Sequence, residues 1–125
     1  MTNLTQRVLD YTETIRQLVP TITSETNWAP LAAFVAVDDF ERVGTFLEVH
    51  DWPQYVAMLT QWASLVDRFD TTMHRITESG RLVFYEIEER HSRGDRVNRV
   101  NSMTVFEFDD DERICHLDVY LQQAR

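Results

Sequence analysis

The sequence contains no lysine, because all twelve of its basic side chains are arginines. This absence excludes mechanisms that need a lysine Schiff base, a pyridoxal phosphate anchor or a phosphate-loop lysine. Only three glycines are present, which argues against a glycine-rich nucleotide-binding loop, so we expect no cofactor. The single cysteine, Cys115, cannot form an internal disulfide and fits a reducing compartment, so we expect a cytoplasmic protein.

Charge and hydropathy narrow the class of partner. The net charge of −9 argues against nucleic acid and against an anionic membrane surface. No window approaches the roughly 18 apolar residues of a membrane span, and the N-terminus has no basic stretch followed by an apolar run. No linker-like tract interrupts the 125 residues, so we expect one domain over residues 1–125.

Metal binding is not expected from the spacing of the potential ligands. His50, His74, His91 and His116 form no HxH, HxxxH or HExxH motif, and Cys115 has no partner motif. The acidic run 109–112 lacks the glycine and the spaced ligands of a calcium-binding loop, so it reads as a solvated hairpin tip.

Helical periodicity is confined to the N-terminal half. Apolar residues recur at helical spacing over residues 3–19, which predicts an amphipathic helix ending before Pro20. A short second helix is predicted over residues 28–35. Asp51 is a plausible N-cap for a third helix that runs to Val66. Residues 40–43 and 46–49 read as two short strands.

Four strand-like runs follow, over residues 69–76, 82–91, 97–108 and 114–121. They are rich in β-branched and aromatic residues, and the breaks between them are rich in Gly, Asp and Ser. This pattern predicts an antiparallel meander. Because helices precede a run of strands, we expect an α+β domain in which the three helices cover one face of a curved, mainly antiparallel sheet.

The lengths assumed for the three turns fix how the strands pair, and this pairing assigns each strand residue to one of two faces. If Glu78 pairs with Arg81, Arg93 with Arg96, and Phe108 with Arg113, alternation predicts one apolar face and one polar face. The predicted apolar face carries Ile76, Val83, Tyr85, Ile87, Val100, Phe106, Phe108, Leu117, Val119 and Leu121, with Thr72, His74, Ser102 and Thr104 as its polar members. The opposite face carries most of the charges and is expected to be solvated or to contact a partner.

This order of elements resembles the nuclear transport factor 2-like superfamily, which includes ketosteroid isomerase and SnoaL-like polyketide cyclases. The resemblance is carried by the segments 38–44, 51–55, 104–108 and 113–121. It implies a cone-like α+β barrel with a pocket between sheet and helices, and a homodimer paired through the outer sheet face. The isomerase's catalytic carboxylate corresponds to residues 40–44, whose only acid is Glu41. Its oxyanion-stabilising acid corresponds to Thr104, and its tyrosine to Tyr11.

The predicted register places His74, Tyr85 and Thr104 in one row, and we expect these three to be catalytic. A histidine beside a phenol and a hydroxyl in an apolar wall suits a general acid/base with orienting partners. The predicted substrate-binding residues are Trp28, Phe34, Arg42, Ile87, Ser102, Phe106, Leu117 and Val119. The competing interpretation is that the row consists of hydrogen-bonded core groups. If the faces are reversed, the polar cluster Glu86, Glu88, Asn101 and Asp118 becomes the site.

Two functions fit these observations. The first is a small-molecule-binding domain, and as an enzyme a cofactor-independent isomerase, cyclase or dehydratase acting on a hydrophobic substrate by acid/base chemistry. The alternative is a non-catalytic dimerisation or protein-interaction domain that uses the outer sheet face. Epoxide hydrolysis needs an Asp-Arg-Asp set in the pocket, for which no spacing matches.

Overall fold

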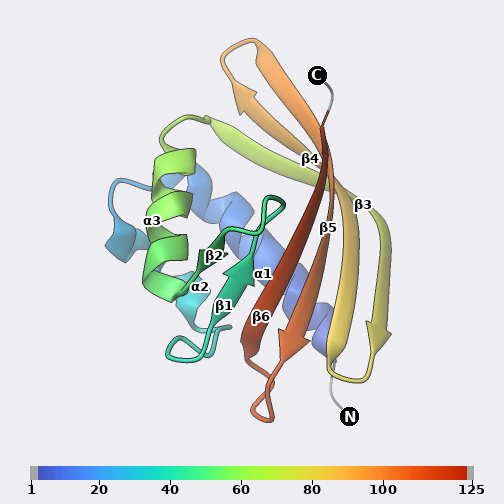
Figure 1. The fold of residues 1–125 in the computed structure, drawn as a ribbon. Coiled ribbons are helices and arrows are strands. Elements are labelled where there is room, and N and C mark those ends of the chain that lie inside the picture. Colours follow the sequence, from blue (N-terminus) through green and yellow to red (C-terminus); the bar gives the residue numbers. More distant parts are fainter. Residues whose placement is uncertain (1–2, 124–125) are drawn as a thin grey trace.

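Helices line one side of a curved six-stranded sheet in the computed structural model, which describes residues 3–123 (Figure 1). The helices are α1 (Leu4–Leu18), α2 (Ala29–Ala32) and α3 (Trp52–Ala63), and two 3-10 turns lie at Val19–Thr21 and Glu25–Trp28. The strands are β1 (Glu41–Val43), β2 (Val49–His50), β3 (Arg68–Ser79), β4 (Leu82–Arg93), β5 (Arg96–Phe108) and β6 (Ile114–Gln123). The predicted α+β architecture is confirmed.

The two long helices begin at side-chain caps. The Asn3 side chain accepts a hydrogen bond from the Gln6 N–H and starts α1. At α3, the predicted Asp51 cap is confirmed: Asp51 Oδ1 accepts from the Gln54 N–H at 2.9 Å, and Gln54 Oε1 accepts from the Asp51 N–H at 2.9 Å. The predicted helix 28–35 is shorter than expected, because α2 ends at Ala32.

The sheet has the strand order β2-β1-β6-β5-β4-β3, and only the β1–β6 pair is parallel. Between β4 and β5 the predicted register is confirmed, with Arg93 opposite Arg96 and Tyr85 opposite Thr104. Between β5 and β6 the register differs by two residues, so Thr104 lies opposite Val119 rather than Leu117. A shift of two residues leaves each side chain on its predicted face. We call the face toward α1 and α3 the inner face and the opposite one the outer face.

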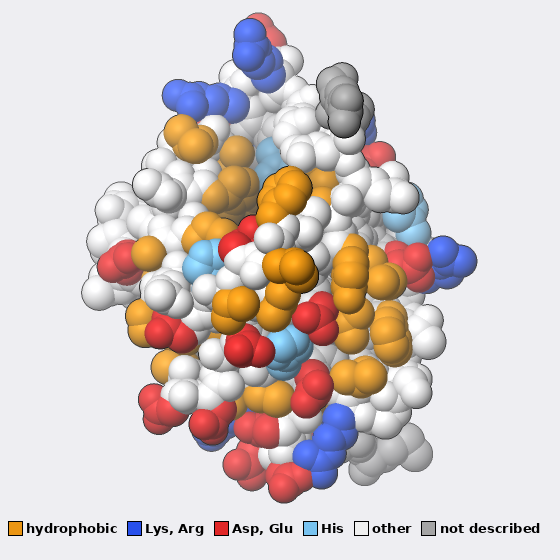
Figure 2. All heavy atoms as spheres, viewed as in Figure 1, with side chains coloured by type: hydrophobic (Ala, Val, Ile, Leu, Met, Phe, Trp, Pro, Cys, Tyr) orange, Lys and Arg blue, Asp and Glu red, His pale blue; other side chains and the backbone are white. Residues whose placement is uncertain are grey.

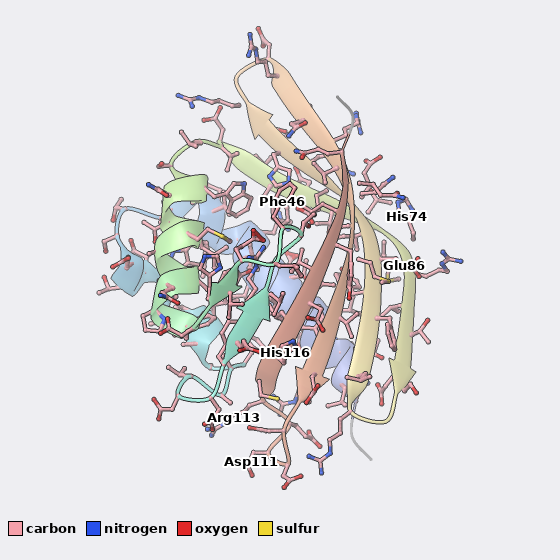
Figure 3. All side chains as sticks on the ribbon, in the orientation of Figure 1. Phe46, His74, Glu86, Asp111, Arg113 and His116 are labelled. Carbon is pink, nitrogen blue, oxygen red and sulfur yellow. The ribbon has the colours of Figure 1, made fainter. Side chains whose placement is uncertain are left out.

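A β-bulge in β3 overturns the predicted position of His74. The predicted pairing of Glu78 with Arg81 is wrong, because Glu78 lies opposite Val83 and Ile76 opposite Tyr85. The register then shifts between Met73 and Arg75, and Thr72 lies opposite Glu88. The extra residue is His74, whose Nε2 lies 3.3 Å from Asn101 Oδ1 on the outer face (Figure 3). The bulge thus turns His74 away from the helices, and the predicted inner row of His74, Tyr85 and Thr104 is wrong at its first member.

The predicted strand over residues 46–49 is wrong as well. Residues 44–48 form a tight turn in which the Leu47 N–H donates to the Gly44 carbonyl at 2.9 Å and the Gly44 N–H to the Glu48 carbonyl at 2.9 Å. Leu47 has a φ of 66°, which no strand residue adopts. Phe46, 86% exposed, lies in this turn between β1 and β2 (Figure 3).

The core lies between the inner face and the helices. Val8 and Leu31 from the helical side meet Val83, Ile114 and Leu117 from the strands, and all five are almost completely buried. Among the described residues, no helix is both long enough and apolar enough to span a bilayer.

Candidate functional site

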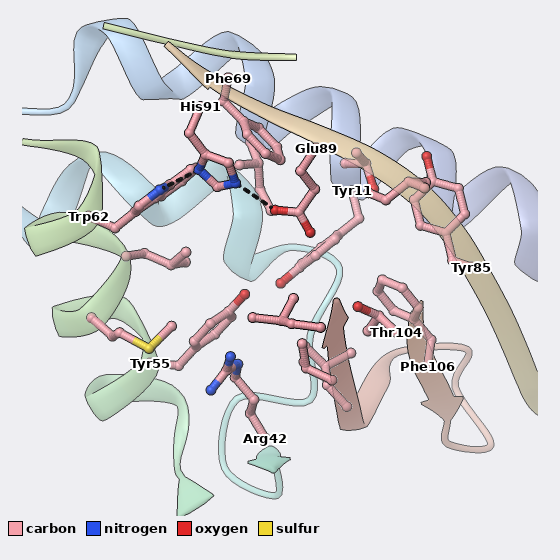
Figure 4. Close-up of a pocket in the computed structure, with 18 residues that line it drawn as sticks. Tyr11, Arg42, Tyr55, Trp62, Phe69, Tyr85, Glu89, His91, Thr104 and Phe106 are labelled. Atoms are coloured by element: carbon pink, nitrogen blue, oxygen red, sulfur yellow. Dashed lines mark hydrogen bonds and ion pairs between the residues drawn. The ribbon is translucent and has the colours of Figure 1, made fainter. Parts of the chain in front are cut away.

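A cavity of about 350 Å³ lies between α1, α3 and the inner face of the sheet (Figure 4). We call it the inner cavity. It is lined by Tyr11, Thr12, Ile15, Arg42, Tyr55, Met58, Leu59, Trp62, Phe69, Tyr85, Ile87, Glu89, His91, Thr104, Phe106, Leu117, Val119 and Leu121. The walls are therefore mainly aliphatic and aromatic, and only a few polar side chains project into the space.

Three of the lining residues form a hydrogen-bonded chain. The indole N–H of Trp62, on α3, donates to His91 Nδ1 at 2.8 Å, and His91 Nε2 lies 2.9 Å from Glu89 Oε1 (Figure 4). Because the indole nitrogen is only a donor, Nδ1 must accept, and the ring proton is assigned to Nε2, where it donates to the carboxylate. A histidine held in one tautomer thus fixes the position of Glu89.

Two buried tyrosines lie near this carboxylate. Figure 4 shows Tyr11 and Tyr55 directed into the same part of the inner cavity as Glu89. Burial raises the pKa of Tyr11 well above its ordinary value, and the neighbouring Tyr55 raises it further. Burial also raises the pKa of Tyr55, although Arg42 acts in the opposite direction. Both phenols therefore remain protonated donors at neutral pH, and the Tyr11 hydroxyl lies beside that of Tyr55 without a hydrogen bond of normal geometry to any described residue.

Arg42 approaches the cavity from β1. Its guanidinium carbon lies 5.3 Å from the centre of the Tyr55 ring, a cation–π contact, and its Nη1 lies 3.4 Å from His50 Nδ1. No carboxylate within the described residues forms an ion pair with it. The inner cavity thus contains one positive and one negative side chain that are not paired with each other.

Comparison with solved structures places the fold. A protein of Shewanella putrefaciens assigned as a SnoaL-like polyketide cyclase has a TM-score of 0.77 at 13% identity, over 97% of this chain and 80% of that one. An NTF2-like protein of Anabaena variabilis gives 0.76 at 15%, over 99% and 96%. The chain has the nuclear transport factor 2-like fold.

A steroid delta-isomerase of Pseudomonas aeruginosa shares this NTF2-like fold with a TM-score of 0.67 at 20% identity, over 98% of this chain and 81% of that one. No protein-family model matches the chain, and no curated protein matches it in sequence. At these identities the likeness concerns the fold, so the chemistry has to be argued from the residues of the cavity.

Most of the sequence-predicted pocket residues line the inner cavity of this NTF2-like fold. They are Tyr85, Thr104, Arg42, Ile87, Phe106, Leu117 and Val119. The Tyr85 hydroxyl, however, lies beside the side chains of Thr12 and Thr71, which lower the pKa of this phenol less than burial raises it. Figure 4 shows it directed away from Tyr11 and Tyr55, so Tyr85 presents its ring to the cavity.

Four predicted site residues lie elsewhere. His74 is on the outer face, as the bulge requires. Trp28 is 1% exposed and donates its indole N–H to Thr60 Oγ1 at 3.0 Å, so it is a core residue and does not border the opening. Phe34 packs edge-on against the Tyr11 ring, 6.2 Å between centroids, and Ser102 is buried outside the cavity lining.

The residues that sequence reasoning missed are the polar ones. Glu89 and His91 follow Tyr85 and Ile87 at alternate positions of β4, so alternation places them on the inner face, although they were not among the residues predicted for that face. Trp62 and Tyr55 lie on the third helix, but no sequence signal indicated that Trp62 would meet His91. Among residues 3–123, no three His, Cys, Asp or Glu side chains come together to hold a metal ion.

The outer face carries the alternative candidate site, the polar cluster of Glu86, Glu88, Asn101 and Asp118. The carboxylates of this cluster already contact basic side chains. Glu86 pairs with Arg75 at 2.7 Å, and Glu88 with Arg90 and Arg99 at 2.9 and 3.1 Å. Asp118 Oδ1 lies 3.0 Å from His116 Nε2. Figure 2 shows hydrophobic and acidic side chains interspersed over this side of the molecule. In this NTF2-like fold Glu86 and Glu88 are thus ion-paired at the surface, and Asp118 contacts the His116 ring there.

Proposed function

We propose that the protein binds a small hydrophobic carbonyl compound in the inner cavity and isomerises or cyclises it by cofactor-independent acid/base chemistry. The observation that carries this proposal is the chain from Trp62 through His91 to Glu89. It ends in a carboxylate that faces an apolar cavity and two protonated phenols. A positioned base opposite hydrogen-bond donors is what proton abstraction beside a carbonyl group requires.

In this mechanism Glu89 removes a proton from the carbon next to the substrate carbonyl. Negative charge then develops on the carbonyl oxygen, and the hydroxyls of Tyr11 and Tyr55 donate hydrogen bonds to it. The Tyr11 hydroxyl is available for this task, because it makes no hydrogen bond of normal geometry with the neighbouring Tyr55 or with any other described residue. In a substrate with a C=C bond one carbon further from the carbonyl, protonated Glu89 returns the proton to the far carbon of that bond, and the double bond shifts into conjugation with the carbonyl. Alternatively, the enolate carbon attacks the carbon of a second carbonyl group in the same molecule; the π bond of that group breaks, its oxygen takes the proton from Glu89, and a ring closes.

His91 and Trp62 are positioning residues in this scheme. The Nε2–H of His91 holds Glu89 Oε1 and leaves the other carboxylate oxygen free to act as the base. Arg42 lies on the opposite wall, where its charge stabilises the developing oxyanion through the tyrosine pair. The expected substrate is hydrophobic because the remaining walls are aliphatic and aromatic, and about 350 Å³ suits a small ligand.

Two further observations support this proposal. Glu89 lies in the cavity between the helices and the inner face, whereas the outer carboxylates Glu86 and Glu88 are ion-paired at the surface. In addition, the structurally similar proteins are named as a SnoaL-like polyketide cyclase and a steroid delta-isomerase. Both names fit substrates that are hydrophobic carbonyl compounds.

The experiment uses β-tetralone, a hydrophobic ketone with acidic protons beside its carbonyl. Exchange of these protons for deuterium in D₂O, followed by NMR, reports abstraction by any base in the cavity. We expect the wild-type protein to accelerate exchange and Glu89→Gln to lose about 100-fold or more, which is the usual contribution of a general base. Glu86→Gln is the matched control, because it removes an outer-face carboxylate. Equal rates in wild type and Glu89→Gln would refute the proposal.

The outer face supports a second proposal, that the chain forms a homodimer. Tyr120 is 55% exposed there, and the neighbouring side chains of Met103 and Val105 are half-buried and apolar, between the ion pairs described above. Apolar contacts ringed by charge are typical of a protein interface. Light scattering tests this: we expect twice the chain mass, and a mass near 14.8 kDa would contradict it.

A further inference from the structure

A second hollow of about 410 Å³ adjoins the inner cavity at the end of the β4–β5 hairpin. The two spaces share the side chains of Trp62, Glu89, His91 and Leu121. On the far side, the second hollow is lined by Arg93 and Arg96, one from each strand of the hairpin. The hydrogen-bonded chain of the candidate site therefore forms the border between an apolar space and a basic one.

Arg93 and Arg96 have no acidic partner among residues 3–123. Seven of the eleven arginines within residues 3–123 form ion pairs, namely Arg7, Arg16, Arg68, Arg75, Arg81, Arg90 and Arg99. The other four pair with no carboxylate of that range. Three of the four, Arg42, Arg93 and Arg96, line the two adjoining spaces, although the chain has a net charge of −9.

The strand register also places the positive charges of Arg93 and Arg96 opposite each other. Arg93 lies directly opposite Arg96 in the register, and like charges at such positions repel each other. The only carboxylate that lines the second hollow is Glu89, which is held by His91. Asp95, in the hairpin turn, forms no ion pair with a described residue, and Asp67, which precedes β3, accepts the Gly94 N–H at 2.7 Å. An anion between the two guanidinium groups relieves the repulsion.

We infer that the ligand of the inner cavity is an amphipathic anion, whose apolar body fills the cavity and whose carboxylate, sulfonate or phosphate group is held by Arg93 and Arg96. This inference rests on the proposed function, because it assumes an apolar ligand in the inner cavity. It adds the chemical class of that ligand and its orientation, with the anionic end toward the β4–β5 hairpin and the reacting carbon near Glu89.

A matched pair of fluorescent probes tests the inference. N-phenylnaphthylamine and anilinonaphthalene sulfonate share the same apolar body, and only the second carries an anionic group. Titrations at low ionic strength give the ratio of their affinities for wild type, Arg93→Gln, Arg96→Gln and the double variant. Arg113→Gln is the control, since Arg113 is also exposed and unpaired with described carboxylates but lies next to the β5–β6 turn (Figure 3).

We expect each hairpin substitution to lower the preference for the sulfonate about threefold and the double variant to lower it about tenfold, the usual scale for exposed charge contacts. Affinity for the neutral probe and the Arg113→Gln ratio remain at wild-type values. Added salt abolishes the preference in wild type. An unchanged ratio in the double variant, or an equal fall in Arg113→Gln, overturns this inference and leaves the proposed function untouched. Failure of the neutral probe to bind wild type refutes the apolar ligand, and with it both proposals.

Discussion

Trp62 and Trp28 each donate an indole hydrogen bond to a side chain on the helical side of the sheet. Comparing them gives a controlled test of the Trp62–His91–Glu89 chain. Trp62 donates to His91 Nδ1 at 2.8 Å, and Trp28 donates to Thr60 Oγ1 at 3.0 Å. Replacement of either residue by Phe removes one indole N–H and one ring. Only Trp62 belongs to the site, so the two variants separate the role of the bond in stability from its role in catalysis.

The magnitudes follow from burial. The His91 side chain is 18% exposed, so losing its donor leaves a mostly buried acceptor unpaired, which costs about 1–2 kcal/mol. Trp28 is 1% exposed, so Trp28→Phe also leaves a cavity, and we expect about 2–3 kcal/mol. Without Trp62, the His91 proton can move to Nδ1 and the ring then no longer donates to Glu89. A bias of about 1 kcal/mol lost in this way changes the ratio of the two His91 tautomers about fivefold, which is the upper limit for the resulting loss of rate.

The assay combines urea unfolding, followed by far-ultraviolet circular dichroism, with the β-tetralone exchange rate under conditions where each variant is fully folded. We expect Trp28→Phe to be the less stable variant and to exchange at the wild-type rate. Trp62→Phe is expected to be the more stable of the two and to exchange more slowly, by up to about fivefold. A wild-type exchange rate in Trp62→Phe, or equal loss in both variants, would show that the histidine tautomer has no catalytic role.

Three other predictions concern Tyr11 and the outer-face residue His74. Burial raises the pKa of Tyr11, so the unfolded chain loses this proton first as the pH rises. The free energy of unfolding is therefore undiminished below about pH 10 and falls above it. Tyr11→Phe is expected to reduce that fall, which urea titrations at pH 8 and pH 11 measure. At pH 7, Tyr11→Phe is expected to be as stable as wild type or up to about 1 kcal/mol more stable, because it removes a buried hydroxyl that makes no hydrogen bond of normal geometry. The same variant slows β-tetralone exchange. Clear destabilisation would show that the hydroxyl is hydrogen-bonded. His74→Ala leaves probe affinity and exchange at wild-type values, and a loss in either would contradict its outer position.

The fold was predictable because the strands carry strong local signals. The breaks at Gly80 and Gly94 have left-handed glycines with a φ of 58°, and the Gly94 turn sets the hairpin that places Tyr85 opposite Thr104. The β3–β4 and β5–β6 registers were each predicted two residues away from the observed ones. A shift of two residues does not by itself move a side chain to the other face, because side chains alternate with a period of two.

The position of His74 was not predictable in the same way. One extra residue reverses the face of everything that precedes it in β3, and nothing in the run Thr72-Met73-His74-Arg75 marks the bulge. Trp28 illustrates a different limit, since its burial depends on α3, which is far away in the sequence. The meeting of Trp62 with His91, residues 29 positions apart, likewise depends on tertiary packing.

Glu89 and His91 could have been identified from the sequence. Their alternation with Tyr85 and Ile87 assigns them to the inner face, but a run of mixed charges at the end of β4 resembles a solvated strand end. The structure explains why they are tolerated there: the Trp62 N–H and the carboxylate satisfy both ring nitrogens of His91, so the polar groups enter an apolar wall as a paired unit.

The central claim is that the inner cavity binds a hydrophobic carbonyl compound beside Glu89. A crystal structure of the protein saturated with β-tetralone tests it most directly. We predict the ketone inside the inner cavity, with its oxygen within hydrogen-bond distance of the Tyr11 or Tyr55 hydroxyl and an acidic carbon next to the Glu89 carboxylate. A filled inner cavity, or a ketone bound only on the outer face near Tyr120, would contradict the claim.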